Sequence, residues 1–182
     1  MLPGTTVIYT IHDLLKASSE YGNCGITKVI LKQEGKNGGI GVLLFNSIED
    51  VYSQSVVGAH SFPFVIQPFI QNFRDLRIII LDDYLEAYER ISSGSFRHNI
   101  HCGGSSQPAN LTDQQLRLCK KIMGQGGFPY GHIDLLITDD GTNYFTEINL
   151  RGGLRGAAID SVAYQEKINK IQAELCCKAL EQ

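Results

Sequence analysis

The sequence lacks any apolar run close to the roughly 20 residues that a helix needs to cross a bilayer. Its first residues, MLPGTTVIYT, also lack the charged and apolar segments of a signal peptide. Neither sign of charge dominates, since 16 Lys and Arg stand against 19 Asp and Glu, for a net charge of -3. This balance gives no general attraction to nucleic acid or to an anionic membrane. We therefore expect a cytoplasmic protein that binds neither.

The chain has no CxxC pair, and its 5 cysteines are odd in number, so neither a zinc knuckle nor a disulfide framework is indicated. It also lacks internal repeats and low-complexity linkers. β-Branched and aromatic runs predict strands at 27–33, 40–45, 64–70, 76–81, 84–91, 132–138 and 142–149. Helices are predicted at 11–20, 48–57, 113–123 and 161–180. Helices mixed with mostly antiparallel hairpins predict an α+β fold with two lobes that meet near residues 64–70.

Residues 132–149, HIDLLITDDGTNYFTEIN, predict a β-hairpin whose Asp-Gly pair at 140–141 is the preferred two-residue loop. In that register Asp139 faces Thr142, and alternation separates an apolar face from a polar one. The apolar face is then formed by Ile133, Leu135, Ile137, Tyr144 and Ile148.

The polar face of this hairpin gathers three oxygen-bearing side chains. Counting outward from the turn sets Asp134 opposite Glu147, with Asn149 on the same face. Like charges that face each other destabilise a sheet, so a cation that offsets the repulsion is the best explanation. Hard oxygen ligands suit Mg²⁺. Two alternatives stay open: a solvated strand face on which the two acids never meet, or a turn of another length that shifts the register.

Residues 27–45, TKVILKQEGKNGGIGVLLF, combine lysines with a glycine-rich turn between two strands. Glycine lets the backbone approach an anion and point N–H groups at it, so Gly38 and Gly39 are candidates for a phosphate-binding flap. Lys32 is the candidate phosphate-contacting ammonium, and Lys28 is a weaker one. The Walker A pattern is absent, and a strand follows the glycines, so a helix N-terminus is not expected to hold the phosphates.

A third signal is a cluster of arginines. Arg77 and Arg90 lie near the base of a hairpin that turns at 82–83, and Arg97 and Asn99 follow in a Gly/Ser loop. Guanidinium groups bind carboxylate or phosphate in bidentate fashion, so several of them facing one cleft would hold an acidic substrate. A surface position is the alternative for each arginine taken singly.

These motifs, in this order, resemble the ATP-grasp superfamily and, within it, the RimK-like ligases, which add glutamate to a protein C-terminus or form related peptide-like bonds. The resemblance includes LPGT, QPFI, DLR, ER, SFRHNIHCGG, HIDLL and EINLRGGLRG. It implies an ATP-grasp fold of two α+β lobes built on mostly antiparallel sheets, with ATP bound between them. Residues 1–65 would form the N-terminal lobe with the glycine-rich flap, and 66–182 the C-terminal lobe with the metal site. The family's N-terminal pre-ATP-grasp domain would be absent.

The resemblance also implies roles for individual residues. Lys32 would contact the ATP phosphates, backbone groups of Pro68 and Phe69 would hold the adenine, and Asp75 would take the ribose. Arg97 and Asn99 would lie on the transferred phosphoryl and substrate side. Arg77 and Arg90, from the arginine cluster, are further catalytic candidates. Asp134, Glu147 and Asn149 would bind one or two Mg²⁺ ions, or Mn²⁺ in their place.

The implied reaction transfers the γ-phosphoryl group to a carboxylate, and an amine then attacks the acyl phosphate. The partners would be a carboxylate substrate and an amine co-substrate that is an amino acid, a peptide or a protein C-terminus; homo-oligomer formation stays open. Arg151-Gly152 stands where the family has Ser-Pro, on the acceptor side, which weakens the case for glutamate as substrate. Two alternatives remain: a nucleotide-binding module or pseudoenzyme without ligase activity, and a phosphotransferase.

Overall fold

The computed structural model describes residues 2–35, 40–92, 96 and 104–181. Its elements follow in the order β1 (Thr6–Ile8), α1 (Ile11–Asn23), β2 (Val29–Gln33), β3 (Val42–Phe45), α2 (Ile48–Val56), β4 (Phe64–Pro68), β5 (Phe73–Leu81), β6 (Tyr84–Ile91), β7 (Ser105–Pro108), α3 (Asp113–Gly126), β8 (Tyr130–Thr138), β9 (Asn143–Asn149) and α4 (Ser161–Leu180). Within these described ranges, no helix is long and apolar enough to cross a membrane.

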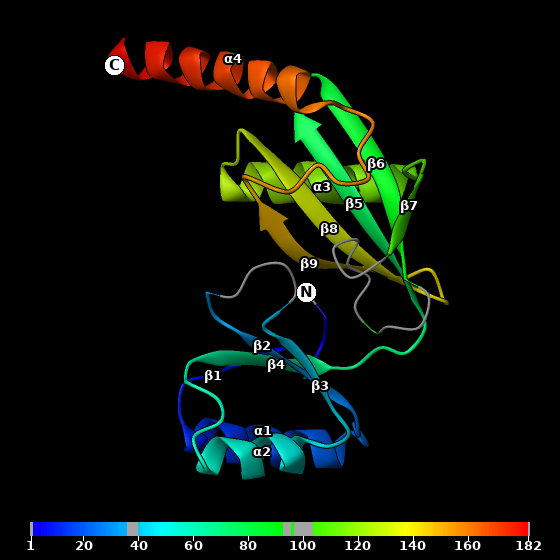
Figure 1. Cartoon of the computed structure of the whole chain (residues 1–182), viewed down its shortest axis with the longest axis vertical. Helices are drawn as coiled ribbons and strands as arrows, with labels where there is room; N and C mark the ends of the chain where they lie inside the picture. The colour runs from blue at the N-terminus through cyan, green and yellow to red at the C-terminus, as the bar shows by residue number, and fades with distance from the viewer. Residues whose placement is uncertain (1, 36–39, 93–95, 97–103, 182) are drawn as a thin grey trace.

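The N-terminal part is an antiparallel sheet in the order β1-β4-β2-β3, with α1 and α2 on its outer face (Figure 1). Val29 and Leu31 of β2 are buried in the core that the sheet shares with these helices. Because side chains alternate along a strand, Lys32 lies on the opposite face. That face is directed toward the C-terminal part of the molecule (Figure 1).

The C-terminal part is a second antiparallel sheet in the order β7-β6-β5-β8-β9. On β5, Leu76 and Ile78 pack in the core beneath α3. Ile79 and Leu81 pack on the opposite face against α4. Asp75 and Arg77 share the face of Ile79, so the helix α4 covers one end of the face that carries the polar residues.

The α+β class predicted from the sequence is confirmed, and every predicted strand and helix is present. β6 and α4 have the predicted bounds, whereas β1 and β7 were not predicted. Both are short strands at sheet edges. β7 has the sequence SSQP, which carries no alternation of apolar and polar residues, so pairing with β6 alone makes it a strand.

The β8–β9 turn differs from the predicted two-residue loop. The Gly141 N–H donates to the Thr138 carbonyl and the Thr138 N–H to the Thr142 carbonyl, so residues 139–141 form the loop. Gly141 has a φ of 81°, as the last residue of a three-residue loop requires. Ile137, and not Thr138, therefore pairs with Asn143.

A β-bulge at Thr146 then shifts the pairing by one residue, because Leu135 pairs with Phe145 while Asp134 pairs with Glu147. The Thr146 hydroxyl donates to the Asp134 carbonyl across 3.1 Å. The two shifts cancel, so the predicted Asp134–Glu147 pair is confirmed although the predicted turn is wrong. Between turn and bulge the faces are exchanged, and Phe145 takes the core position predicted for Tyr144.

The connection between the two sheets lies between Pro68 and Phe73. A division after residue 65 would cut β4, which pairs with β1 and β2. We therefore move the proposed lobe boundary to this connection.

Two glycines near the end of α3 offer a matched test of its C-terminus. Gly127 adopts a left-handed φ of 62° and caps the helix, whereas Gly124 lies within it and an added Cβ would meet nothing within 4 Å. Gly127→Ala is expected to lower the free energy of unfolding by about 1 kcal/mol, and Gly124→Ala to raise it by about 0.5 kcal/mol. Urea unfolding followed by circular dichroism measures both; equal effects would contradict the assigned cap.

Candidate functional site

The Asp134 carboxylate lies buried on β8, with 3% of its side chain exposed. Arg77 on β5 donates two hydrogen bonds to it, from Nε to Oδ1 and from Nη2 to Oδ2, each 2.7 Å long. Arg90 on β6 donates a third, from Nη2 to Oδ2, at 2.8 Å. Burial favours the protonated acid, but the two guanidinium groups hold the pKa of Asp134 below its usual value. Asp134 is therefore an ionised carboxylate inside the protein.

Glu147 pairs with Asp134 across the ladder, and 52% of its side chain is exposed. The Asn149 Nδ2 donates to Glu147 Oε1 at 2.9 Å. Burial and the negative charge of Asp134 both raise the pKa of Glu147. The three predicted metal ligands are thus brought together, and Arg77 Nη2, which lies 3.7 Å from Glu147 Oε1, offsets part of the repulsion between the two acids.

The donor set fits Mg²⁺ by its chemistry. Asp134, Glu147 and Asn149 supply hard oxygen atoms, and Mg²⁺ takes one or two protein carboxylates and completes its shell with water and phosphate. The described residues contain no group of three or more His, Cys, Asp and Glu side chains placed to hold a metal. The candidate set consists of two acids and one amide.

Lys32 on β2 faces these acids from the other sheet. Burial lowers the pKa of its ammonium group, and the negative charges of Glu147, Asp134 and Asp75 oppose that change. The charge of this lysine interacts with all three carboxylates, although the lysine belongs to the N-terminal sheet. The predicted phosphate-contacting lysine and the predicted metal ligands therefore share one site between the sheets.

Asp75 and the two arginines are engaged with one another rather than turned outward. The Arg90 Nη2 lies 2.6 Å from Asp75 Oδ1 and bridges Asp75 to Asp134. Burial raises the pKa of Asp75 to about 6, against the opposing charge of Arg90. The ribose-binding role of Asp75, and the substrate-binding roles of Arg77 and Arg90, stay predictions, because each side chain is already paired within the protein.

The backbone limits the hydrogen-bonding groups that the predicted adenine hinge can offer. The Phe69 N–H donates to the Lys28 carbonyl at 2.9 Å, and Pro68 has no N–H. These two residues can therefore offer a nucleobase carbonyl groups only. Gly38, Gly39, Arg97 and Asn99 lie outside the described residues, so their predicted roles stay predictions.

Three further residues at the site carried no predicted role. His132 on β8 is fully buried, and its Nε2 lies 3.0 Å from the Tyr164 hydroxyl of α4. A Cβ added to Gly152 would lie only 2.1 Å from His132 Nδ1, so the chain after β9 passes directly over the imidazole. The one signal in the sequence for this close contact was Gly152 itself, which stands where the family has proline. With His132 beneath it, this position has no room for a larger residue.

Comparison with known proteins decides the family. The model of the RimK-like ATP-grasp domain matches residues 3–171. This chain belongs to the RimK-like ATP-grasp family. It is similar to a probable alpha-L-glutamate ligase of Trichodesmium erythraeum, with 30% identity over 85% of this chain and 52% of the relative. It is 26% identical to a glutathione synthetase of Agrobacterium fabrum over 82% of this chain and 47% of the relative.

Solved structures show the same fold. An ATP-grasp ligase of Chryseobacterium gregarium, in complex with ADP and a leader and core peptide, has a TM-score of 0.66 and 18% identity, covering 98% of this chain and 55% of that one. D-alanyl-alanine synthetase A of Vibrio cholerae has a TM-score of 0.64 and 13% identity, covering 98% and 60%. The RimK-like chain spans about half the length of the curated relatives it matches.

The two carboxylates of this ATP-grasp site should differ in their effect on stability. Asp134→Asn removes a buried charge that satisfies two arginines and is expected to lower the free energy of unfolding by about 3 kcal/mol. Glu147→Gln, at a half-exposed position, is expected to change it by less than about 1 kcal/mol. Thermal and urea unfolding measure both. Similar losses for the two variants would contradict the assigned ion network.

His132 predicts a pH dependence. Burial lowers its pKa to about 4 from 6.5, so the unfolded chain takes up a proton that the folded chain excludes as pH falls. The free energy of unfolding should therefore fall by up to about 3 kcal/mol through this group as the pH is lowered from 6.5 to 4. Unfolding measured against pH should therefore be less steep for His132→Leu than for the unsubstituted protein in this window. Parallel curves would contradict the neutral, buried imidazole.

Proposed function

We propose that this chain is the ATP-grasp part of an ATP-dependent carboxylate–amine ligase that works through an acyl phosphate. The observation that carries the proposal is the position of Lys32, on the face of the N-terminal sheet that is directed toward the C-terminal sheet with its acids Asp134 and Glu147. A lysine on one side and oxygen ligands on the other suit a metal-bound triphosphate between them. ATP and Mg²⁺ are thus the proposed co-substrate and cofactor, and Mn²⁺ is an acceptable replacement.

The residues of the chain would act by placement and charge. Asp134, Glu147 and Asn149 would hold Mg²⁺, which neutralises charge on the phosphates when it is bound. Lys32 would contact the phosphates from the other lobe. Arg77 and Arg90 would fix Asp134 in position and balance its charge, a role that their hydrogen bonds favour over direct substrate binding. Preorganised charges of this kind supply most of the catalysis in phosphoryl transfer.

The relatives support an amino acid or a peptide as substrate. The relatives reported above, at 26% and 30% identity, are named glutathione synthetase and probable alpha-L-glutamate ligase. Arg97 and Asn99 are proposed to lie on the phosphoryl and substrate side. The second candidate is a nucleotide-binding module without ligase activity, favoured by the pairing of Arg77 and Arg90 with acids of the protein itself, which leaves neither arginine free for an acidic substrate.

Release of ADP from Mg-ATP, measured with a panel of amino acids and dipeptides, tests the ligase. At least one amine and carboxylate pair should stimulate ADP release. Glu147→Gln should lower the stimulated rate roughly 100-fold, since it removes one charge from the metal site. Glu174→Gln is the matched control, because Glu174 lies on α4 and its side chain is equally exposed, at 52%.

If no member of the panel stimulates ADP release while Mg-ADP still binds, the nucleotide-binding module is left as the function. Stimulated release that Glu147→Gln leaves unchanged would show that the phosphates bind elsewhere.

A further inference from the structure

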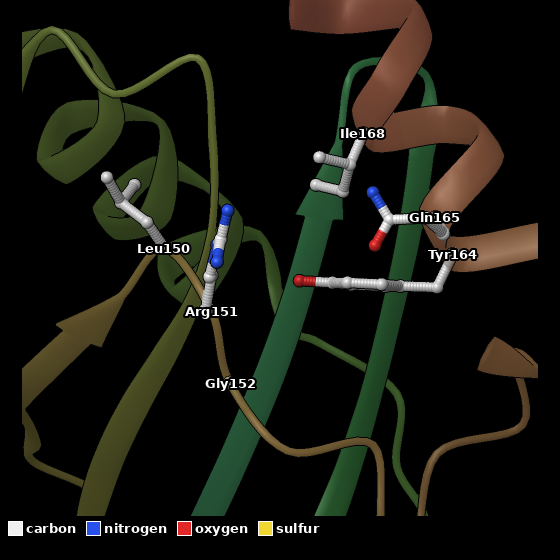
Figure 2. Close-up of a pocket in the computed structure, with 6 residues that line it drawn as sticks. All are labelled: Leu150, Arg151, Gly152, Tyr164, Gln165 and Ile168. Carbon is white, nitrogen blue, oxygen red and sulfur yellow. The ribbon is translucent and has the colours of Figure 1, made fainter.

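A small pocket lies beside the metal face, between the chain that follows β9 and the first turns of α4. Its volume is about 220 Å³, and it is lined by Leu150, Arg151, Gly152, Tyr164, Gln165 and Ile168. Figure 2 shows the chain that carries Arg151 and Gly152 on one side of this space and α4 with Tyr164, Gln165 and Ile168 on the other. None of these residues belongs to the proposed metal or phosphate site.

The pocket is held in place by buried contacts. The Tyr164 hydroxyl bonds with His132 Nε2 at 3.0 Å, and Gly152 lies against the same imidazole. His132 pairs with Asn149 across the ladder. Arg151 comes two residues after Asn149, so the pocket begins directly after the strand that carries two of the proposed metal ligands.

Arg151 gives the pocket its charge. Its side chain is exposed, and no ion pair among the described residues involves it. This sets it apart from Arg77 and Arg90, which are both neutralised by buried acids. Burial raises the pKa of the Tyr164 hydroxyl and the Arg151 charge opposes that rise, which is consistent with their facing positions.

The walls of the pocket suit a small organic acid. Leu150 and Ile168 offer apolar surface, and the Gln165 amide supplies a polar group that also bonds with Asn169 at 2.8 Å. A guanidinium binds a carboxylate through two parallel hydrogen bonds, which fixes both position and orientation. The volume is below the 300–1,000 Å³ of pockets for drug-sized ligands, and it corresponds to a molecule of amino-acid size.

We propose that this pocket binds the free carboxylate of the amine co-substrate, an amino acid or the C-terminal residue of a short peptide, through Arg151. The apolar walls cover the adjoining side chain. The amine would then be directed toward the carbonyl carbon of the acyl phosphate, whose phosphate group leaves when the C–N bond forms. This assignment rests on the proposed ligase function and names the group by which the acceptor is recognised.

The test compares alanine, valine and leucine with their amides, which keep the amine and lose the carboxylate. Equilibrium binding to the full chain with Mg-ADP present is measured by saturation-transfer NMR. At least one amino acid should bind roughly 10-fold more tightly than its amide, as expected for a charge-assisted pair. Arg151→Gln should bring that amino acid to the level of its amide and leave Mg-ADP affinity unchanged.

Arg155→Gln is the matched control, because Arg155 is an exposed arginine of the same loop that does not line the pocket. It should keep the preference for the acid. The proposal is overturned if no amino acid of the panel binds more tightly than its amide, or if the preference survives in Arg151→Gln.

The ADP assay separates this outcome from the fate of the ligase proposal. If the preference for an amino acid over its amide depends on Arg151 but no ADP release is stimulated, the ligase proposal is wrong and the carboxylate site stands. If ADP release is stimulated and the KM for the acceptor is the same in the unsubstituted protein and in Arg151→Gln, only the carboxylate site is contradicted.

Discussion

A buried carboxylate must be paired, and this constraint shapes the centre of the molecule. Asp134 lies within the larger sheet, where an ionised acid without partners would be strongly destabilising. Arg77 and Arg90 meet this need from the two strands that precede it in sheet order, and Asp75 shares Arg90. The ion network therefore fixes the neighbouring strands at the point where the sheet faces the N-terminal lobe.

The same network sets the charge of the site. Asp75, Asp134 and Glu147 carry negative charge on the C-terminal sheet, while Arg77, Arg90 and Lys32 carry positive charge around them. Lys32 lies on the N-terminal sheet and the other five residues lie on the C-terminal sheet, so the balance of charge depends on how the two sheets approach each other. A bound metal and nucleotide would enter a site whose own charges are already nearly matched.

The hairpin of β8 and β9 shows how a correct conclusion can follow from an incorrect step. The Asp-Gly turn signal, counted with a two-residue loop, placed Asp134 opposite Glu147. The chain uses a three-residue loop and a bulge at Thr146, and the two shifts restore that pair. Alternation alone could not reveal the bulge, because Phe145 and Tyr144 are both suitable core residues and only packing beneath α3 selects between them.

The sequence by itself determined the α+β class, the order of the main strands and helices, and the gathering of two acids and one amide near one turn. These follow from local rules of alternation, capping and turn preference, which act between residues close in the chain. Only the tertiary structure decided that Asp134 is held by Arg77 and Arg90, and that Gly152 passes over His132 to leave a pocket at Arg151. Such contacts join residues far apart in sequence, and their geometry depends on how whole strands and helices pack.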